Sequence, residues 1–372
     1  MYIDIHAHLR DFNEKHKETI AHALRVAQDS GLSAIFDMAA NGNPLCIDEE
    51  TVEARLATAY AEDSPVFYGL YIGLTAEPEQ IKEAVQLHEK YFPKPGDRVG
   101  VVGLKYFAGR SVNDSISVIK EETQKGLYRT SGEVHYQGVL AVHCEKEASM
   151  NPGLWNSHVP RTHSLARPEE SEYDSINDQI EFAIDEGFEG HLHICHVSTP
   201  QSVKLINSYK KYLKISCGAT PHHLLLDTDI MEGKNGILFK VNPPLRAPET
   251  RQGLLKCFLN GEIDILESDH APHTLQEKRE KYMSGIPCLA SWPDVRELLS
   301  ERGMTEELLD NMAYHNVNRI FGLNIPRYPG EVKHGAHLKE YAFDPYASLK
   351  NKPLGSYEPS HSENRGFSDS SL

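Results

Sequence analysis

The chain has 372 residues, enough to bury the core of one large barrel or of two smaller domains. Asp and Glu number 54 against 38 Lys and Arg, and the formal charge of −16 disfavours nucleic acid and anionic membrane surfaces as partners. The sequence shows neither an apolar run of membrane-spanning length nor a signal peptide, so we expect a cytoplasmic protein that acts on a small molecule.

Apolar, β-branched runs alternate with amphipathic segments, a pattern typical of βα units around a parallel sheet. Helical spacing separates most of these runs. Eight strands with intervening helices are the count of a (β/α)8 TIM barrel, an α/β fold whose active sites lie at the C-terminal ends of the strands. The predicted strands cover residues 2–8, 33–38, 65–72, 99–107, 138–144, 190–198, 213–219 and 263–269.

The remaining segments give the domain organisation. Two long connections, 146–167 and 226–261, are predicted to cover the catalytic face of the barrel. We assign residues 1–323 to the barrel and 324–347 to a short separate segment. Residues 348–372 are polar and rich in Ser, Gly and Pro, which predicts a flexible tail.

The first predicted strand carries polar side chains at alternate positions: Asp4, His6, His8 and Arg10. Burying such groups costs free energy unless they are paired. Because side chains alternate between the faces of a strand, we expect His6 and His8 to point into the barrel near its top. Asp4 lies deeper and is expected to anchor hydrogen bonds. An H-x-H pair alone is also compatible with two solvated histidines.

Four later strands end in ionisable residues, at the positions where this fold builds its active sites. Histidine and aspartate side chains together form a donor set suited to Zn²⁺ or a similar divalent metal. The sequence therefore predicts a metal centre at the top of the barrel. Its members are His6, His8, Lys105, His143, His196 and Asp269.

The six cysteines are scattered without a C-x-x-C pair, so we expect reduced and mostly buried thiols. Cys144 and Cys195 each stand one residue from a proposed ligand, and strand alternation predicts that both face the helices as packed thiols. His193 lies three residues before His196 and therefore has the opposite parity. It is a poor ligand candidate.

Lys105 lies among apolar neighbours in "VVGLKYF". A protonated amine beside divalent cations is strongly disfavoured. A lysine that has reacted with CO₂ becomes an anionic carbamate, which can bridge two metals. The alternative is an ordinary buried lysine paired with an acid, but the surrounding histidines and aspartate favour the carbamate.

The residues and motifs that surround these positions resemble dihydroorotase of the amidohydrolase superfamily, from about residue 2 to about residue 323. The resemblance implies a metal-dependent enzyme that interconverts N-carbamoyl-L-aspartate and L-dihydroorotate in de novo pyrimidine biosynthesis. The motifs are "DIHAHLRD", "GLKYF", "AVHCE", "HICHVST", "TPHHL", "KVNPPLR" and "SDHAPHT", in this order.

The resemblance also assigns roles within the metal centre. It implies that His6, His8 and Asp269 bind one zinc ion, and that N6-carboxylated Lys105 bridges this ion to a second one. The second ion would be held by the remaining two histidines, His143 and His196. Asp269 would also act in catalysis by carrying a proton between the attacking water and the departing amide nitrogen.

Substrate contacts follow from the same resemblance. Arg10, Asn41 and His273 match positions that bind the substrate carboxylate, and Asn242 matches a contact to the ring. An Arg in this place supports that role, because an acidic protein needs a local cation to bind an anionic substrate. The alternatives are a surface ion pair for Arg10 and loop-capping amides for the two asparagines.

The sequence departs from the family pattern in three places. Phe12-Asn13 replaces Pro-Gly, Gly218 stands where "CEVTPHHL" has an acid, and "GIPCLA" (285–290) replaces "GIPGLE". The last change affects a segment that ordinarily contacts the substrate ring. Residues 324–347 resemble a vestige of the β-sandwich that many relatives carry.

Two other functions stay open at this point. One is another cyclic-amide hydrolase of the hydantoinase or allantoinase kind, and the other is a non-catalytic, dihydroorotase-like scaffold. Loss of metal ligands would favour the scaffold, but no ligand is lost. The resemblance further allows a homodimer and an association with aspartate carbamoyltransferase.

Overall fold

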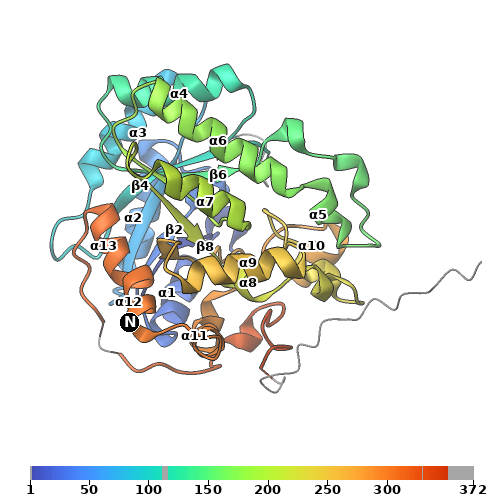
Figure 1. The fold of residues 1–372 in the computed structure, drawn as a ribbon. Helices are drawn as coiled ribbons and strands as arrows, with labels where there is room; N and C mark the ends of the chain where they lie inside the picture. Colours follow the sequence, from blue (N-terminus) through green and yellow to red (C-terminus); the bar gives the residue numbers. More distant parts are fainter. Residues whose placement is uncertain (1, 111–115, 329, 351–372) are drawn as a thin grey trace, which may run out of the picture.

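In the computed structural model a single parallel sheet curls into a barrel that helices surround (Figure 1). The structure describes residues 2–110, 116–328 and 330–350, without the side chain of Asn41. The α/β barrel predicted from the sequence is confirmed. The barrel strands are β1 (Tyr2–Ala7), β2 (Leu32–Asp37), β3 (Phe67–Gly73), β4 (Val99–Ala108), β6 (Val139–Cys144), β7 (His191–Ile194), β8 (Ile215–Ala219) and β9 (Ile265–Leu266).

The strands follow one another around the barrel in chain order, β1-β2-β3-β4-β6-β7-β8-β9. A parallel bridge between Ala7 and His270 joins the end of β1 to the segment after β9 and closes the ring. A further two-residue strand, β5 (Ser117–Val118), pairs with β4 outside this order. The carboxyl ends of all eight barrel strands therefore meet at one end of the molecule.

Helices connect most of the strands and cover the outside of the barrel (Figure 1). The longer ones are α1 (Ile20–Asp29), α2 (Glu49–Ala61), α3 (Pro78–Tyr91), α4 (Glu121–Glu133), α6 (Glu169–Asp185), α7 (Pro200–Tyr209), α9 (Pro248–Leu259) and α11 (Trp292–Ser300). The shorter ones are α5 (Thr162–Ala166), α8 (Pro221–Leu225), α10 (Leu275–Glu280), α12 (Glu306–Asp310) and α13 (Asn316–Phe321).

Short 3₁₀ turns and one π-helical turn complete the secondary structure of the described residues. The π-helical turn is η9 (Asn311–His315), between α12 and α13. The 3₁₀ turns are η1 (Phe12–Glu14), η2 (Ala39–Asn41), η4 (Glu147–Ser149), η5 (Pro152–Leu154), η6 (Thr228–Met231), η7 (Gly236–Phe239), η8 (Leu289–Ser291) and η10 (Leu338–Glu340).

Side-chain caps fix where several helices begin. The Thr19 side chain accepts a hydrogen bond from the backbone N–H of His22 at the start of α1. Asp48 forms a reciprocal capping box with Thr51 at the start of α2. Such caps satisfy backbone donors that have no partner within the helix, and each stabilises the helix by about 1 kcal/mol.

The lower part of the barrel interior is apolar and closed by α13. Phe36, Tyr71 and Phe321 pack there, and the ring centroids of Phe36 and Phe321 lie 5.2 Å apart. Burying each such side chain contributes about 1.5–3 kcal/mol. The pocket with polar side chains lies above this apolar cluster, at the end of the barrel where the strands terminate.

Three segments differ from the sequence prediction. The last strand has two residues, 265–266, where 263–269 was expected, and β7 ends at Ile194. The backbone leaves the β conformation beyond these points, with φ of 37° at His196 and 45° at Asp269. The connection 226–261 is not a long loop throughout, because α9 occupies its second half.

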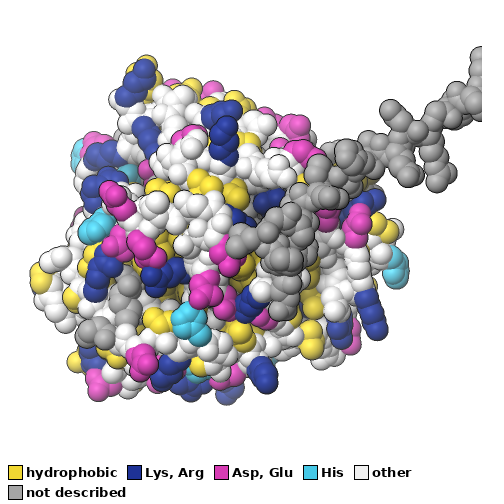
Figure 2. All heavy atoms as spheres, turned by 60° about the horizontal axis from the view of Figure 1, so that its bottom comes forward, with side chains coloured by type: hydrophobic (Ala, Val, Ile, Leu, Met, Phe, Trp, Pro, Cys, Tyr) yellow, Lys and Arg dark blue, Asp and Glu magenta, His cyan; other side chains and the backbone are white. Residues whose placement is uncertain are grey.

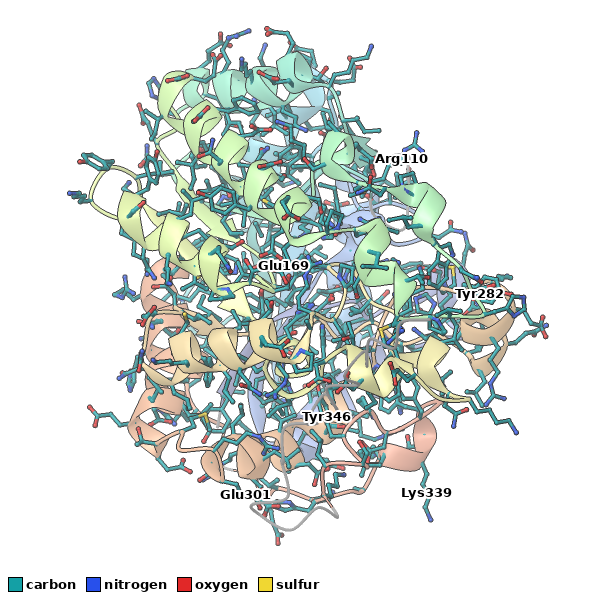
Figure 3. All side chains as sticks on the ribbon, turned by 45° about the vertical axis from the view of Figure 1, so that its right-hand side comes forward. Arg110, Glu169, Tyr282, Glu301, Lys339 and Tyr346 are labelled. Carbon is teal, nitrogen blue, oxygen red and sulfur yellow. The ribbon has the colours of Figure 1, made fainter. Side chains whose placement is uncertain are left out.

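The C-terminal segment packs against the barrel without forming a strand in the described part of residues 324–347, where its one regular turn is η10. Tyr346 is fully buried, and its hydroxyl lies 3.6 Å from the Cys288 sulfur (Figure 3). Most of the predicted tail, residues 351–372, lies outside the described residues.

Acidic and basic side chains are interspersed on the face of the molecule shown in Figure 2. The acidic excess is therefore not gathered into one patch on that face. Within the part of the chain that the structure describes, no helix is both long enough and apolar enough to cross a membrane.

Candidate metal centre

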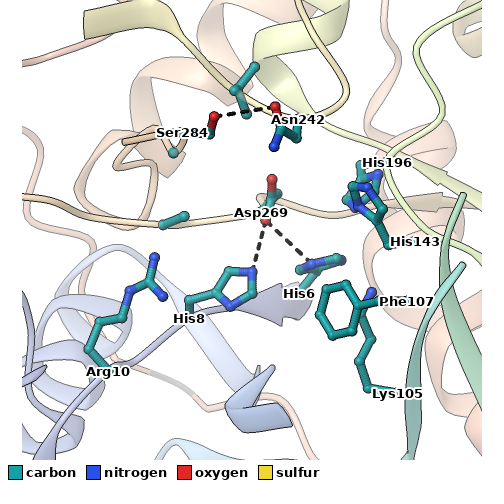
Figure 4. Close-up of a pocket in the computed structure, with 13 residues that line it drawn as sticks. His6, His8, Arg10, Lys105, Phe107, His143, His196, Asn242, Asp269 and Ser284 are labelled. Atoms are coloured by element: carbon teal, nitrogen blue, oxygen red, sulfur yellow. Dashed lines mark hydrogen bonds and ion pairs between the residues drawn. The ribbon is translucent and has the colours of Figure 1, made fainter. Parts of the chain in front are cut away.

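A pocket opens at the carboxyl ends of the barrel strands (Figure 4). It contains all six predicted metal ligands and two of the four predicted substrate contacts. The residues that line it are His6, His8, Arg10, Lys105, Phe107, His143, His196, Val241, Asn242, Asp269, Ala271, Ser284 and Gly285.

Three of the predicted ligands converge on one point. Nε2 of His6 and Nε2 of His8 lie 3.3 and 3.2 Å from Oδ1 of Asp269 (Figure 4). Ligand atoms bound tetrahedrally at about 2.0–2.1 Å from Zn²⁺ stand roughly 3.3 Å apart. Both distances to Asp269 fit a shared metal ion, and the three residues offer ligand atoms that all lie within 4.8 Å of one another.

The electrostatics of this trio suit a cation. Burial would raise the pKa of the Asp269 carboxyl, but the hydrogen bond from His8 and the electrostatic interaction with His6 hold that pKa well below its usual range. Burial lowers the pKa of His6 to about 4. An ionised carboxylate beside a neutral imidazole offers lone pairs to a metal at neutral pH.

Two further histidines face each other on the opposite side of the pocket. Nδ1 of His143 lies 3.1 Å from Nε2 of His196. Burial lowers the pKa of both imidazoles, which keeps them neutral at pH 7. The other ring nitrogen of His143, Nε2, lies 3.0 Å from the buried carboxylate of Glu145. That contact fixes the ring so that Nδ1 points into the pocket.

Lys105 lies deep in the same pocket and is fully buried. Its Nζ is 3.2 Å from the Cys195 sulfur and 4.8 Å from the centroid of the Phe107 ring. Among the residues that the structure describes, no carboxylate lies within ion-pair distance of this amine. The alternative of an ordinary buried lysine paired with an acid therefore finds no partner here.

The position of Cys195 corrects the sequence prediction. Its thiol does not face the helices but lies inside the barrel against Lys105. His193 also lies inside, 3.4 Å from the Glu267 carboxylate. Strand alternation fails at this point because β7 ends at Ile194 and His196 adopts a positive φ. Cys144, by contrast, packs in the outer core as predicted.

Arg10 forms one wall of the pocket, and only 4% of its surface is exposed. Its NH2 lies 3.4 Å from Nε2 of His273, while its Nε has no hydrogen-bond partner among the described residues. Arg10 also has φ of 57°, an unusual conformation that tends to occur at functional sites. A buried cation with an unpaired donor is suited to an anionic group of a substrate.

Asn242 lies across the pocket from Arg10. Its Oδ1 is 2.8 Å from Nε2 of His163 and accepts a hydrogen bond of 3.2 Å from the Ser284 hydroxyl (Figure 4). His163 belongs to the long connection 146–167, so this segment does reach the pocket wall. Of Asn41, which ends η2, only the backbone is described.

Several pocket residues were missed at the sequence level. Phe107, Val241, Ala271 and Ser284 carry no charge, so no chemical signal distinguished them from core or loop residues. Gly285 belongs to the segment 285–290, which was expected to contact the substrate ring. The altered residues of "GIPCLA", Cys288 and Ala290, do not line the pocket. The unchanged start of this segment does.

Comparison with known proteins finds relatives that match most of the chain. No protein-family model matches the chain. Allantoinases from Salmonella gallinarum and Salmonella paratyphi B are each 30% identical over 378 residues, which cover 95% of this chain and 77% of the relative. The solved L-hydantoinase (dihydropyrimidinase) from Arthrobacter aurescens has a TM-score of 0.74 at 21% identity, over 90% of this chain and 73% of that one. The D-hydantoinase (dihydropyrimidinase) from Thermus sp. has a TM-score of 0.69 at 18% identity, over 90% of this chain and 73% of that one.

Proposed function

The chain belongs to the allantoinase-related cyclic amidohydrolases of the amidohydrolase superfamily, and we propose that it hydrolyses a cyclic amide in the manner of a hydantoinase or an allantoinase. The convergence of His6 and His8 on Asp269, opposite the His143–His196 pair, is the observation that carries this proposal. The names of the relatives favour this class over dihydroorotase, the function that the sequence motifs suggested first.

Two divalent metals, with Zn²⁺ as the first candidate, fit the donor set. His6, His8 and Asp269 would hold one, and His143 and His196 the other. A metal pair of this kind acidifies a water molecule and polarises a carbonyl oxygen.

Lys105, as its carbamate, would supply the anionic oxygens between the two metal positions. The unmodified amine has only a thiol and an aromatic ring as partners that the structure records. Cations placed beside a charged ammonium would be repelled. Carboxylation removes this charge and converts the residue into a ligand.

The chain's own residues supply the proton transfer and the shape of the site. Asp269 would accept a proton from water through one carboxylate oxygen and return it to the leaving ring nitrogen. Phe107, Val241 and Ala271 add apolar surface to the pocket lining, which would limit the access of bulk water and strengthen the electrostatic interactions inside. Asn242 and the Ser284–Gly285 backbone can orient the amide ring.

Dihydroorotate is the second candidate substrate, and Arg10 is the observation that favours it. The buried guanidinium lies on the pocket wall beside His273, with Nε unpaired. A carboxylated ring would give this cation a partner, whereas hydantoin and allantoin have no carboxylate to offer.

A substrate panel tests the proposal. The purified, zinc-loaded enzyme is given allantoin, hydantoin, dihydrouracil and dihydroorotate, and ring opening is followed by absorbance and by release of the open-chain product. Hydrolysis of an uncharged ring supports the hydantoinase or allantoinase type. If dihydroorotate is the only ring that is hydrolysed, the second candidate becomes the assigned function. If none of the four rings is hydrolysed, the proposal is contradicted.

A further inference from the structure

Behind the metal ligands lies a fully buried carboxylate, Glu267, which follows β9 and precedes Asp269 by two residues. Its Oε2 is 3.3 Å from Nδ1 of His6 and 3.4 Å from Nε2 of His193. Its Oε1 accepts a short hydrogen bond from the backbone N–H of His196. One side chain thus contacts a ligand from each half of the proposed centre.

We propose that Glu267 is a positioning residue of the metal centre, and that Gly218 provides the space it occupies. This inference rests on the proposed metal-dependent function. Glu267 would act by holding two ligands in their binding geometry.

The contact with His6 fixes which ring nitrogen can bind a metal. When Nδ1 donates its proton to Glu267, the lone pair remains on Nε2, which is the atom that faces Asp269. A metal-bound histidine that donates its other ring N–H to a carboxylate is held in one tautomer and one orientation.

The contact with His196 acts through the backbone. This residue has φ of 37°, a conformation that a non-glycine residue adopts only at a cost in free energy. The hydrogen bond from its N–H to Glu267 helps to hold that conformation. The conformation in turn directs the imidazole toward His143.

Gly218, on the neighbouring strand β8, leaves room for the Glu267 carboxylate. A Cβ atom at position 218 would lie 2.3 Å from Oε1 of Glu267 and 2.5 Å from its Cδ. Any side chain there would therefore displace the carboxylate. Gly218 pairs with Ile265 in the sheet, two residues before Glu267 on the adjacent segment of chain.

This geometry gives a physical account of a departure noted in the sequence. Position 218 is where the resembling motif carries an acid, and in this structure the acid Glu267, which follows the adjacent strand, occupies the space next to that position. The carboxylate is thus present although its usual position holds glycine.

Glu172 provides a matched control. It is also a buried carboxylate, but it bonds the backbone of Ser198 and the hydroxyl of Ser202 and contacts no proposed ligand. Loss of its charge should affect stability without acting on His6.

The test is the affinity of each metal-stripped, refilled protein for Zn²⁺, measured by competition with a chromophoric chelator. Circular dichroism and the melting temperature of the apo form monitor folding. Glu267→Gln is expected to bind zinc about 10–100-fold more weakly than the wild type, with a retained fold, while Glu172→Gln keeps the wild-type affinity. Equal affinity in Glu267→Gln and wild type overturns the inference.

Gly218→Ala supplies an independent variant should Glu267→Gln fail to fold. It keeps the charge of Glu267 but displaces its carboxylate, so the affinity for zinc should again fall, and an unchanged affinity overturns the inference. A wild-type protein that binds no divalent metal would instead contradict the proposed function. The two failures are therefore distinguishable.

Discussion

Nδ1 of His143 and Nε2 of His196 face each other across 3.1 Å in a buried pocket. The two residues belong to neighbouring strand ends, and the pKa of each imidazole is lowered by burial. Two neutral rings aimed at one point offer two lone pairs to a shared electrophile. The Glu145 carboxylate contacts the other ring nitrogen of His143, Nε2. Arg167 in turn donates a 3.0 Å hydrogen bond from its Nε to this carboxylate.

Lys105→Ala should lose most of the bound metal and nearly all activity, because the bridging carbamate is gone. A short carboxylic acid such as acetate or propionate fits the space left by the side chain and should restore part of both. Metal content per chain and kcat, with and without added acid, measure the effect. Full metal content and activity in Lys105→Ala would rule out the bridging carbamate.

His143→Ala is the matched control for this rescue. It removes a proposed ligand but leaves the Lys105 carbamate in place, so the cavity that it opens lies at the His143 position and a carboxylic acid bound there would not replace the bridging group. Rescue that appears equally in both variants would show that the acid acts elsewhere.

Arg10→Met should leave the metal content unchanged and weaken binding of dihydroorotate by about 2–5 kcal/mol, the range for loss of one partner from a buried charge pair. Uncharged rings such as hydantoin make no ion pair with Arg10, so their KM should stay close to the wild-type value. Calorimetric Kd values and steady-state kinetics test this difference. An unchanged affinity for dihydroorotate removes Arg10 from carboxylate binding.

The stability of the protein should fall in acid partly through Glu18. Burial by itself raises the pKa of this carboxyl, but hydrogen bonds from His22 and His270 lower it from 4.5 to about 2. A carboxyl whose pKa is lower in the folded state contributes stability that is fully present above its unfolded pKa. That contribution is lost as the pH falls from about 4.5 toward 2, and here it amounts to about 3 kcal/mol.

Urea unfolding of wild type and Glu18→Gln across this pH range provides the measurement. The difference in unfolding free energy between the two proteins should be largest above pH 4.5 and should shrink as the pH is lowered. A difference that stays constant with pH would show that Glu18 titrates alike in the folded and unfolded states.

Much of the barrel and of the pocket could be predicted from the sequence. Alternating strands and helices gave the fold, and ionisable residues at strand ends brought His143, His196 and Asp269 into one pocket. These predictions succeed because parallel strands in a barrel share one carboxyl end.

The remaining errors have a local physical cause. Cys195 was placed on the wrong face because regular alternation was assumed up to His196, where the backbone turns to φ of 37°. The role of Glu267 was missed because its partners come from β1 and β7, and Gly218 from β8, contacts that only the closed barrel creates. The alternation of residues along one strand predicts the face on which a side chain lies. It does not predict which side chains of neighbouring strands come into contact.

The most direct test of a two-metal cyclic amidohydrolase is metal analysis combined with ring hydrolysis before and after chelation. The account predicts about two divalent ions per chain, loss of hydrolysis when they are removed, and recovery when Zn²⁺ is returned. Undiminished hydrolysis by a fully metal-free protein would contradict it.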